Sequence, residues 1–172
     1  MIKIIGFVLI LASSTILGFA YAEKFKKRVK ELKEIQRGVY ILKSEINYTR
    51  SLLPEALLKV SEKCEEPVSG IFSEVSHGLI QCDDMDVYTC FVNALKNNRE
   101  KLNLKKDDES ILTDLAKTLG STDIEGHNDI FILTLENLGR AIEDAEDKEN
   151  KNVKMYRYLG FSLGMMIAII LL

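Results

Sequence analysis

Apolar residues are concentrated in one run at each end of the chain. Residues 4–22 contain no charged side chain, and residues 156–172 carry only one, that of Arg157. A helix needs about 20 mainly apolar residues to cross the hydrocarbon core of a membrane, so the first run just suffices and the second is slightly short. Residues 1–22 and 156–172 are therefore predicted to form two transmembrane helices.

Residues 24–50 have the pattern of an amphipathic helix that continues from the first apolar run. Apolar residues recur at spacings of three and four, which places them on one side of a helix, and charged residues fill most other positions. The stripe consists of Phe25, Val29, Leu32, Ile35, Val39, Leu42 and Ile46. Other helices are needed to cover such a stripe.

The rest of the middle region contains five further helix starts. Each is marked by a proline suited to the first helical turn or by an aspartate suited to capping N–H groups. These marks are Pro54, Pro67, Asp86, Asp107 or Asp108, and Asp123. Gly120 is predicted to end the fifth helix in a left-handed conformation, and the sixth helix is predicted to run through residues 143–154 into the C-terminal run. The expected fold is all-α: a six-helix bundle at residues 23–155, flanked by transmembrane helices at the N- and C-terminal ends.

Charge assigns a side of the membrane to the middle domain. The chain has 172 residues and a net charge of −3, which gives no reason to expect a nucleic-acid partner. Its lysines and arginines cluster just after the first run and just before the second, and such flanks tend to stay in the cytoplasm. We expect a two-pass protein of the cell membrane with its middle domain in the cytoplasm.

Two alternatives to this topology remain open. Lys3 precedes the first run and Ala20-Tyr21-Ala22 resembles a cleavage site, so that run has features of a cleaved signal peptide. Cleavage would place the domain outside the cytoplasm. The second run has the alternative of a buried C-terminal helix.

The sequence contains no recognisable catalytic constellation, so we expect no catalytic, cofactor-binding or metal-binding residues. The cysteines are not spaced as metal or redox pairs, and the histidines belong to no zinc motif; these residues are Cys64, Cys82, Cys90, His77 and His127. The same residues would carry the alternative function, a membrane-anchored enzyme or metal-dependent sensor with a helical domain.

Small residues interrupt both apolar runs. Gly160 and Gly164 form a G-x-x-x-G pattern, and Gly6 and Gly18 lie in the first run. Glycines at this spacing let membrane helices approach closely, so all four are candidates for helix packing. The pattern is short, and coincidence is as good an explanation.

Several short pieces occur in an order that resembles the stage III sporulation protein AB family of endospore-forming bacteria. The pieces include Glu45-Ile46 with Tyr48, then Leu53-Pro54, Pro67-Val68 with Ile71-Phe72, Thr118-Leu119-Gly120 with Asp123, and Leu159-Gly160 before Gly164. None is specific alone, but their shared order covers nearly the whole chain.

The resemblance implies a fold and a role. The family's soluble domain is similar to the cytoplasmic domain of the inner-membrane platform protein of type II secretion and type IV pilus systems. It implies a non-enzymatic platform in the mother-cell membrane, within the channel complex between mother cell and forespore that endospore formation requires. The implied partners are the membrane and other stage III sporulation proteins, including the AA ATPase; a homo-oligomer is left open. Leu119, Gly120 and Asp123 are candidates for a partner contact or a structural turn.

Overall fold

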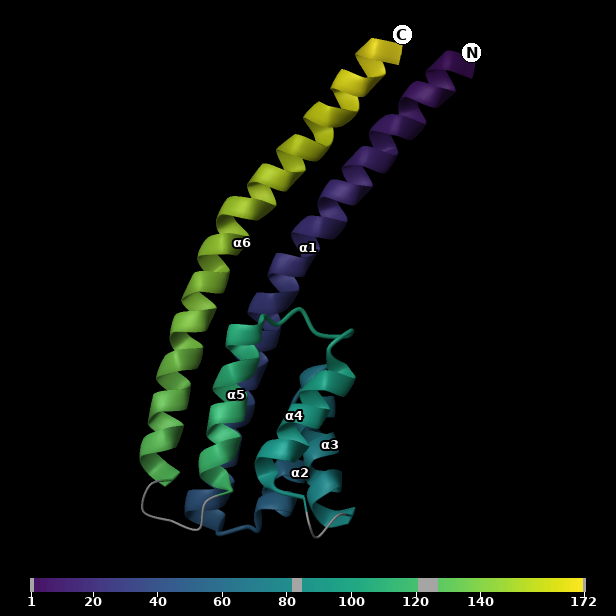
Figure 1. Ribbon diagram of the computed structural model, residues 1–172. Coiled ribbons are helices and arrows are strands. Elements are labelled where there is room, and N and C mark those ends of the chain that lie inside the picture. Colours follow the sequence, from purple (N-terminus) through teal and green to yellow (C-terminus); the bar gives the residue numbers. More distant parts are fainter. Residues whose placement is uncertain (1, 82–84, 121–126, 172) are drawn as a thin grey trace. The chain divides into compact units, whose positions relative to one another are not determined.

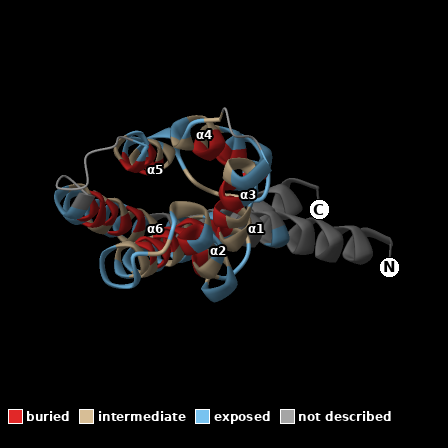
Figure 2. Ribbon diagram, turned by 90° about the horizontal axis from the view of Figure 1, so that it is seen from below, coloured by how far each residue is buried: buried red, intermediate tan, exposed pale blue. Residues whose placement is uncertain are grey.

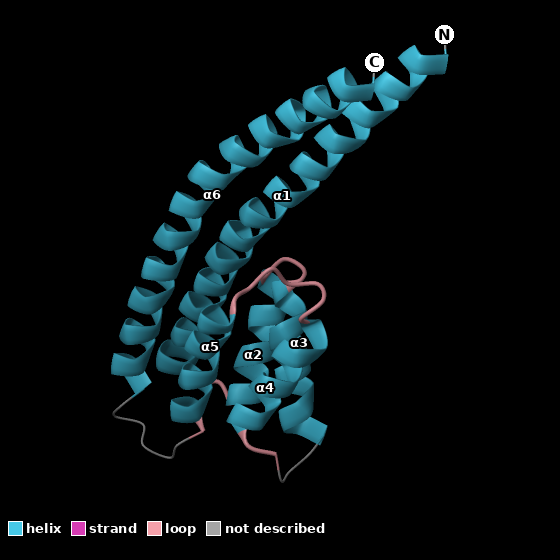
Figure 3. Ribbon diagram, turned by 45° about the horizontal axis from the view of Figure 1, so that its top comes forward, coloured by secondary structure: helices cyan, strands magenta, loops and turns pink. Residues whose placement is uncertain are grey.

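The computed structural model describes the backbone of residues 2–81, 85–120 and 127–171. Side chains are described from residue 22 to residue 151 within those ranges, His127 excepted, and otherwise at Ile16, Met155 and Ser162. The described residues contain helices and no strand, which confirms the predicted all-α class (Figures 1 and 3). The chain divides into two compact units, which are described separately below.

The first unit, here called the terminal unit, comprises residues 1–29 and 144–172. It contains the beginning of α1 (Ile2–Ser44) and the end of α6 (His127–Leu171), which lie side by side (Figure 1). Nη1 of the buried Arg28 lies 3.5 Å from Oδ2 of Asp144. Nζ of Lys148 donates to the same oxygen at 2.7 Å. Asp144 of α6 therefore binds a cation of α1.

The second unit, the bundle unit, comprises residues 30–143. It holds the remaining parts of α1 and α6 and all the shorter helices between them. These are a π-helical turn η1 (Glu45–Thr49), α2 (Leu53–Lys63), α3 (Val68–Gln81), α4 (Val87–Asn98) and α5 (Lys106–Leu119). The number and order of the helices agree with the prediction.

The core of the bundle unit is built from the predicted apolar stripes. Figure 2 shows the buried residues in red on the inward sides of the helices. On α1 the fully buried stripe residues are Leu32, Ile35, Val39 and Leu42. The rings of Phe72 on α3 and Phe91 on α4 meet edge to face, with their centroids 6.4 Å apart. Such aromatic pairs add specific geometry to the burial of apolar area.

The helix caps agree with the sequence except at α5. Asp86 caps α4, because its Oδ1 accepts from the Thr89 N–H at 2.6 Å, and Pro54 lies in the first turn of α2. The prediction that Asp107 or Asp108 caps α5 is wrong: the cap position is Lys105. Oδ2 of Asp108 instead accepts from the Lys105 N–H at 2.8 Å, from inside the first turn. The sixth-helix cap predicted at Asp123 lies outside the described residues.

Candidate functional site

The predicted turn after α5 is described only in part. Leu119 is the last residue of α5 and is 7% exposed, while Asp123 lies outside the described residues. Gly120 has φ −78° and ψ −13°, so the predicted left-handed stop is wrong. Its N–H donates to the Ala116 carbonyl at 3.1 Å, as in a continuing right-handed turn. The helix end needs no glycine for its backbone conformation.

A second segment, the connection between α1 and α2, lies beside Leu119. We call residues 45–53 the Glu45 turn. It begins with the π-helical η1, which is followed by Arg50 with φ 50° and ψ 33°. Left-handed backbone is uncommon for residues other than glycine, and it gathers at functional sites. The sequence analysis extended the first amphipathic helix to residue 50, with Ile46 in its apolar stripe, but α1 ends at Ser44 and η1 follows it. Nothing in the segment marks a left-handed arginine.

Paired charges hold the Glu45 turn in place. Oε2 of Glu45 accepts from Lys59 Nζ at 2.8 Å and from Ser51 Oγ at 3.4 Å, while Oε1 lies 3.5 Å from Lys63 Nζ. The hydrogen bond from Lys59 holds the pKa of the Glu45 carboxyl below its usual range. The turn is therefore fastened to α2 by two lysines.

The Glu45 turn and Leu119 enclose a hollow of about 670 Å³, here called the apolar hollow. Its lining is Ile46, Asn47, Arg50, Ser51, Leu52, Leu53 and Leu119. Tyr48 is 85% exposed and Leu52 is 70% exposed at the same turn. Within the described part of the chain, the Arg50 guanidinium forms no ion pair. Exposed apolar groups around an unpaired cation are features of a surface that binds another protein.

The residues proposed for an enzyme or metal sensor are described only in part. Cys90 is buried, Cys64 is half-buried, and Cys82 and the side chain of His127 lie outside the described residues. Burial, and secondarily the charge of Glu34, raises the pKa of the Cys64 thiol to about 11. His77 is exposed on α3. Among the described residues, no three His, Cys, Asp or Glu side chains are arranged to hold a metal ion.

The membrane predictions concern the terminal unit. No helix in the described part of the chain is long and apolar enough to cross a membrane. Gly6 and Gly18 lie in α1 and Gly160 and Gly164 in α6, but their packing falls outside what the structure describes. Their role in helix packing stays a prediction.

Comparison with known proteins decides the family. Residues 3–172 match the stage III sporulation protein AB family. The chain belongs to this family. The match confirms the resemblance based on short ordered motifs, and it supports a role in sporulation. The family is named as a sporulation protein and not as an enzyme.

Two relatives agree with this assignment. Stage III sporulation protein AB of Bacillus subtilis (strain 168) is 30% identical over 172 residues, covering 100% of both chains. A solved structure of stage III sporulation protein AB superposes with a TM-score of 0.67 at 26% identity. That comparison covers 73% of this chain and 98% of the other.

Proposed function

We propose that this chain is a non-enzymatic platform of the stage III sporulation complex, anchored in the mother-cell membrane and docking a secretion-type ATPase. The observation that carries the proposal is the family match, which extends over residues 3–172 and so includes both apolar ends. A platform needs anchors, a rigid bundle and an exposed contact surface. It needs no reaction centre of its own.

The anchors follow from the two apolar runs and their basic flanks. Residues 1–22 and 156–172 are the proposed spans, and the bundle lies between them in the cytoplasm. Lys24, Lys26 and Lys27 follow the first run and Lys154 precedes the second. Both flanks assign the bundle to the cytoplasmic side by the positive-inside rule.

We assign the ATPase contact to the apolar hollow and the Glu45 turn. Leu52 and Tyr48 offer apolar area, and Arg50 offers an unpaired guanidinium suited to a carboxylate of the ATPase. Arginine and tyrosine are enriched among the residues that dominate binding energy. The turn is held by Glu45 and its lysines, so its shape is preformed.

Recruitment of the AA ATPase to membranes tests the proposal. The full chain in membranes is expected to retain the ATPase, and the double variant Arg50→Glu, Leu52→Ser is expected to weaken binding by roughly tenfold or more, since two dominant contacts are lost. The matched control is Ile80→Ser, Leu133→Ser, which alters two exposed apolar residues elsewhere on the bundle unit. Absence of any recruitment by the unaltered chain would refute the ATPase role.

Topology needs a separate test, because the native cysteines are poor reporters. Cys90 is buried, and the pKa of Cys64 near 11 leaves little reactive thiolate. We would replace the three native cysteines with alanine and introduce Tyr40→Cys, at a 56% exposed position on α1 outside the proposed ATPase contact. An impermeant maleimide is expected to label the introduced thiol only after the mother-cell membrane is opened. Labelling in intact cells would place the bundle outside the cytoplasm.

A further inference from the structure

A second hollow in the bundle unit lies where α2 ends, α3 begins and α4 ends. Its volume is about 360 Å³, and it is here called the acidic hollow. Its lining is polar: Ser61, Glu62, Glu66, Ser69, Gly70, Ser73, Glu74, Asn98 and Lys101. Three carboxylates and one ammonium group give this lining a net charge of −2 at neutral pH. None of these residues entered the proposed function.

The floor of the acidic hollow is a buried amide with an unused acceptor. Asn98 is 2% exposed, and its Nδ2 donates to Glu74 Oε1 at 2.8 Å and to the Ala94 carbonyl at 3.0 Å. Both partners are acceptors, so the orientation of the amide is fixed and both of its hydrogens are used. Asn98 Oδ1 receives no hydrogen bond from any described residue. Buried acceptors are nearly always hydrogen-bonded in folded proteins, so this oxygen is suited to a donor from a ligand.

Gly70 keeps space open next to that acceptor. A Cβ at this position would lie 3.3 Å from Asn98 Oδ1 and 3.5 Å from Glu66 Oε2. Glu66 and Glu62 form no hydrogen bond or ion pair within the described part of the chain. The empty position therefore borders an unpaired carboxylate and an unpaired carbonyl oxygen. Lysine and arginine side chains have only donors and a positive charge, which matches both.

A neighbouring carboxylate shows which kind of group the hollow lacks. Glu65, in the connection between α2 and α3, pairs its Oε2 with Nζ of Lys30 on α1 at 2.7 Å. Glu62 and Glu66, on either side of Glu65 in the sequence, have no such cation within the described part of the chain. The net charge of −2 in the lining is therefore complementary to a basic segment of a partner.

We propose that the acidic hollow binds a lysine or arginine side chain from a basic segment of a partner protein, with Asn98 Oδ1, Glu62 and Glu66 as acceptors. This rests on the assembly role proposed above. The ATPase and this second partner then use different ends of α2. Glu74 acts as a positioning residue, because the amides of Asn97 and Asn98 donate to its two oxygens.

A peptide titration tests the chemistry of the hollow without assuming the partner. The full chain in phosphatidylcholine nanodiscs is titrated with an amidated, fluorescent Lys/Arg heptapeptide, and with the same peptide carrying glutamine at every basic position. We expect binding of the basic peptide alone, weakening as salt increases. Glu62→Gln, Glu66→Gln is expected to weaken it roughly fivefold to tenfold. Gly70→Leu, which fills the space and leaves the charge, is expected to do the same.

The matched control is Glu55→Gln, Glu143→Gln, which removes two exposed carboxylates elsewhere on the bundle unit. Its affinity should stay within twofold of the unaltered chain, and circular dichroism should show every variant folded. If the control variant weakened peptide binding equally, the effect would come from the net charge of the protein and not from the hollow. That result would overturn the proposal. Peptide displacement by calcium or zinc at micromolar concentration would assign the hollow to a metal ion instead.

Photo-cross-linking in sporulating cells identifies the source of the cation. A photoreactive amino acid in place of Ser73, within the lining of the hollow, is expected to cross-link to a Lys/Arg-rich segment of another protein. Cross-links confined to a second copy of this chain, to an acidic segment, or to nothing would overturn the proposed occupant. Loss of membrane association with intact peptide binding would refute the anchoring alone, so the two proposals fail separately.

Discussion

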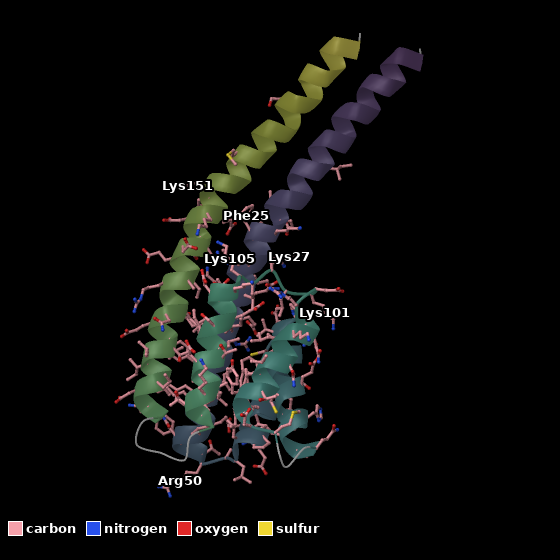
Figure 4. All side chains as sticks on the ribbon, in the orientation of Figure 1. Phe25, Lys27, Arg50, Lys101, Lys105 and Lys151 are labelled. Atoms are coloured by element: carbon pink, nitrogen blue, oxygen red, sulfur yellow. The ribbon has the colours of Figure 1, made fainter. Side chains whose placement is uncertain are left out.

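The two hollows lie at opposite ends of α2 and differ in how their charges are satisfied. Arg50 and Lys101, which line the apolar and the acidic hollow respectively, lie at the two ends of the bundle unit (Figure 4). At the apolar hollow the carboxylate of Glu45 is paired with Lys59, and this pairing shapes the backbone. At the acidic hollow Glu62 and Glu66 have no described cation. At the apolar hollow, paired charges fix the conformation of the turn. At the acidic hollow, two carboxylates stay available to bind a partner.

The same contrast separates structural from binding roles in the sequence. A paired carboxylate loses its stabilising interaction when it is neutralised, whereas an unpaired one among like charges loses repulsion. Substitution of the two kinds should therefore change different measurements. Substitution of Glu45 should lower the stability of the fold. Substitution of Glu62 and Glu66 should lower the affinity for a partner.

The largest expected effect comes from the buried core of the bundle unit, the unit that contains both hollows. In Gly38→Ala the new Cβ would lie 2.8 Å from Phe72 Cε2 and 3.2 Å from Cys64 Sγ. Phe72 is fully buried and has little room to move. We expect the free energy of unfolding to fall by about 1–3 kcal/mol, measured by urea denaturation. Binding at both hollows should decline together.

Gly139→Ala is the matched control, because among the described residues its Cβ would approach Gln36 Nε2 alone, at 4.0 Å. Alanine has the better helix propensity, so this variant should be as stable as the unaltered chain, or more stable by about 1 kcal/mol at most. A stable Gly38→Ala protein would mean that Phe72 repacks freely. The hollows would then not depend on a rigid core.

The next prediction separates the two surfaces. Arg50→Glu should weaken ATPase recruitment and leave binding of the basic peptide unchanged, while Glu62→Gln, Glu66→Gln should do the opposite. Losses at distant sites add, so the combined variant should show both defects at their single-variant sizes, each roughly fivefold to tenfold. A change larger than twofold in peptide binding by Arg50→Glu, or in ATPase recruitment by Glu62→Gln, Glu66→Gln, would show that the two hollows are coupled. The two surfaces could then not be treated as separate sites.

Acid should affect the Glu45 turn. The folded-state pKa of Glu45 is lowered, mainly by its hydrogen bond from Lys59. The resulting stability is present above the unfolded-state pKa, roughly 4.3, and is lost as pH falls through the folded-state pKa. Melting temperatures of the unaltered chain and of Glu45→Gln should therefore differ at neutral pH and converge in acid. Lys59→Gln should reproduce the loss. A difference that persists at low pH would assign the effect to packing.

The helical pattern was predictable because burial and local chemistry agree along most of the bundle unit. The stripe through Leu32, Ile35 and Val39 is read directly from its spacing, and Asp86 caps α4 as its position predicts. The α5 cap was missed because the Asp108 carboxylate, inside the first turn, accepts from the N–H of Lys105 at the cap position. A lysine is not a residue type that marks a helix start. Position relative to the helix start, and not residue type, decides that role.

The candidate sites were harder to predict because tertiary contacts create them. Nothing local marks Arg50 as left-handed, since glycine or asparagine usually fills such positions. The acidic hollow combines residues from α2, α3 and α4 whose apolar faces were predicted but whose mutual register was not. The open acceptor of Asn98 depends on where Glu74 and Gly70 lie relative to it. Spacing within one helix contains none of this information.

The smallest expected effect, that of Gly120→Ala, concerns the residue after Leu119, which lines the apolar hollow. Its φ of −78° suits any residue, and a Cβ would make ordinary contacts, 3.5 Å from Val87 Cβ and 3.5 Å from the Ala116 carbonyl oxygen. The free energy of unfolding should change by less than about 0.5 kcal/mol, again measured by urea denaturation. ATPase recruitment then distinguishes two reasons for glycine after Leu119. Unchanged recruitment means that the position tolerates a methyl group in the complex as well. Reduced recruitment at unchanged stability means that the ATPase packs against this glycine, which would extend its contact from the Glu45 turn to the end of α5.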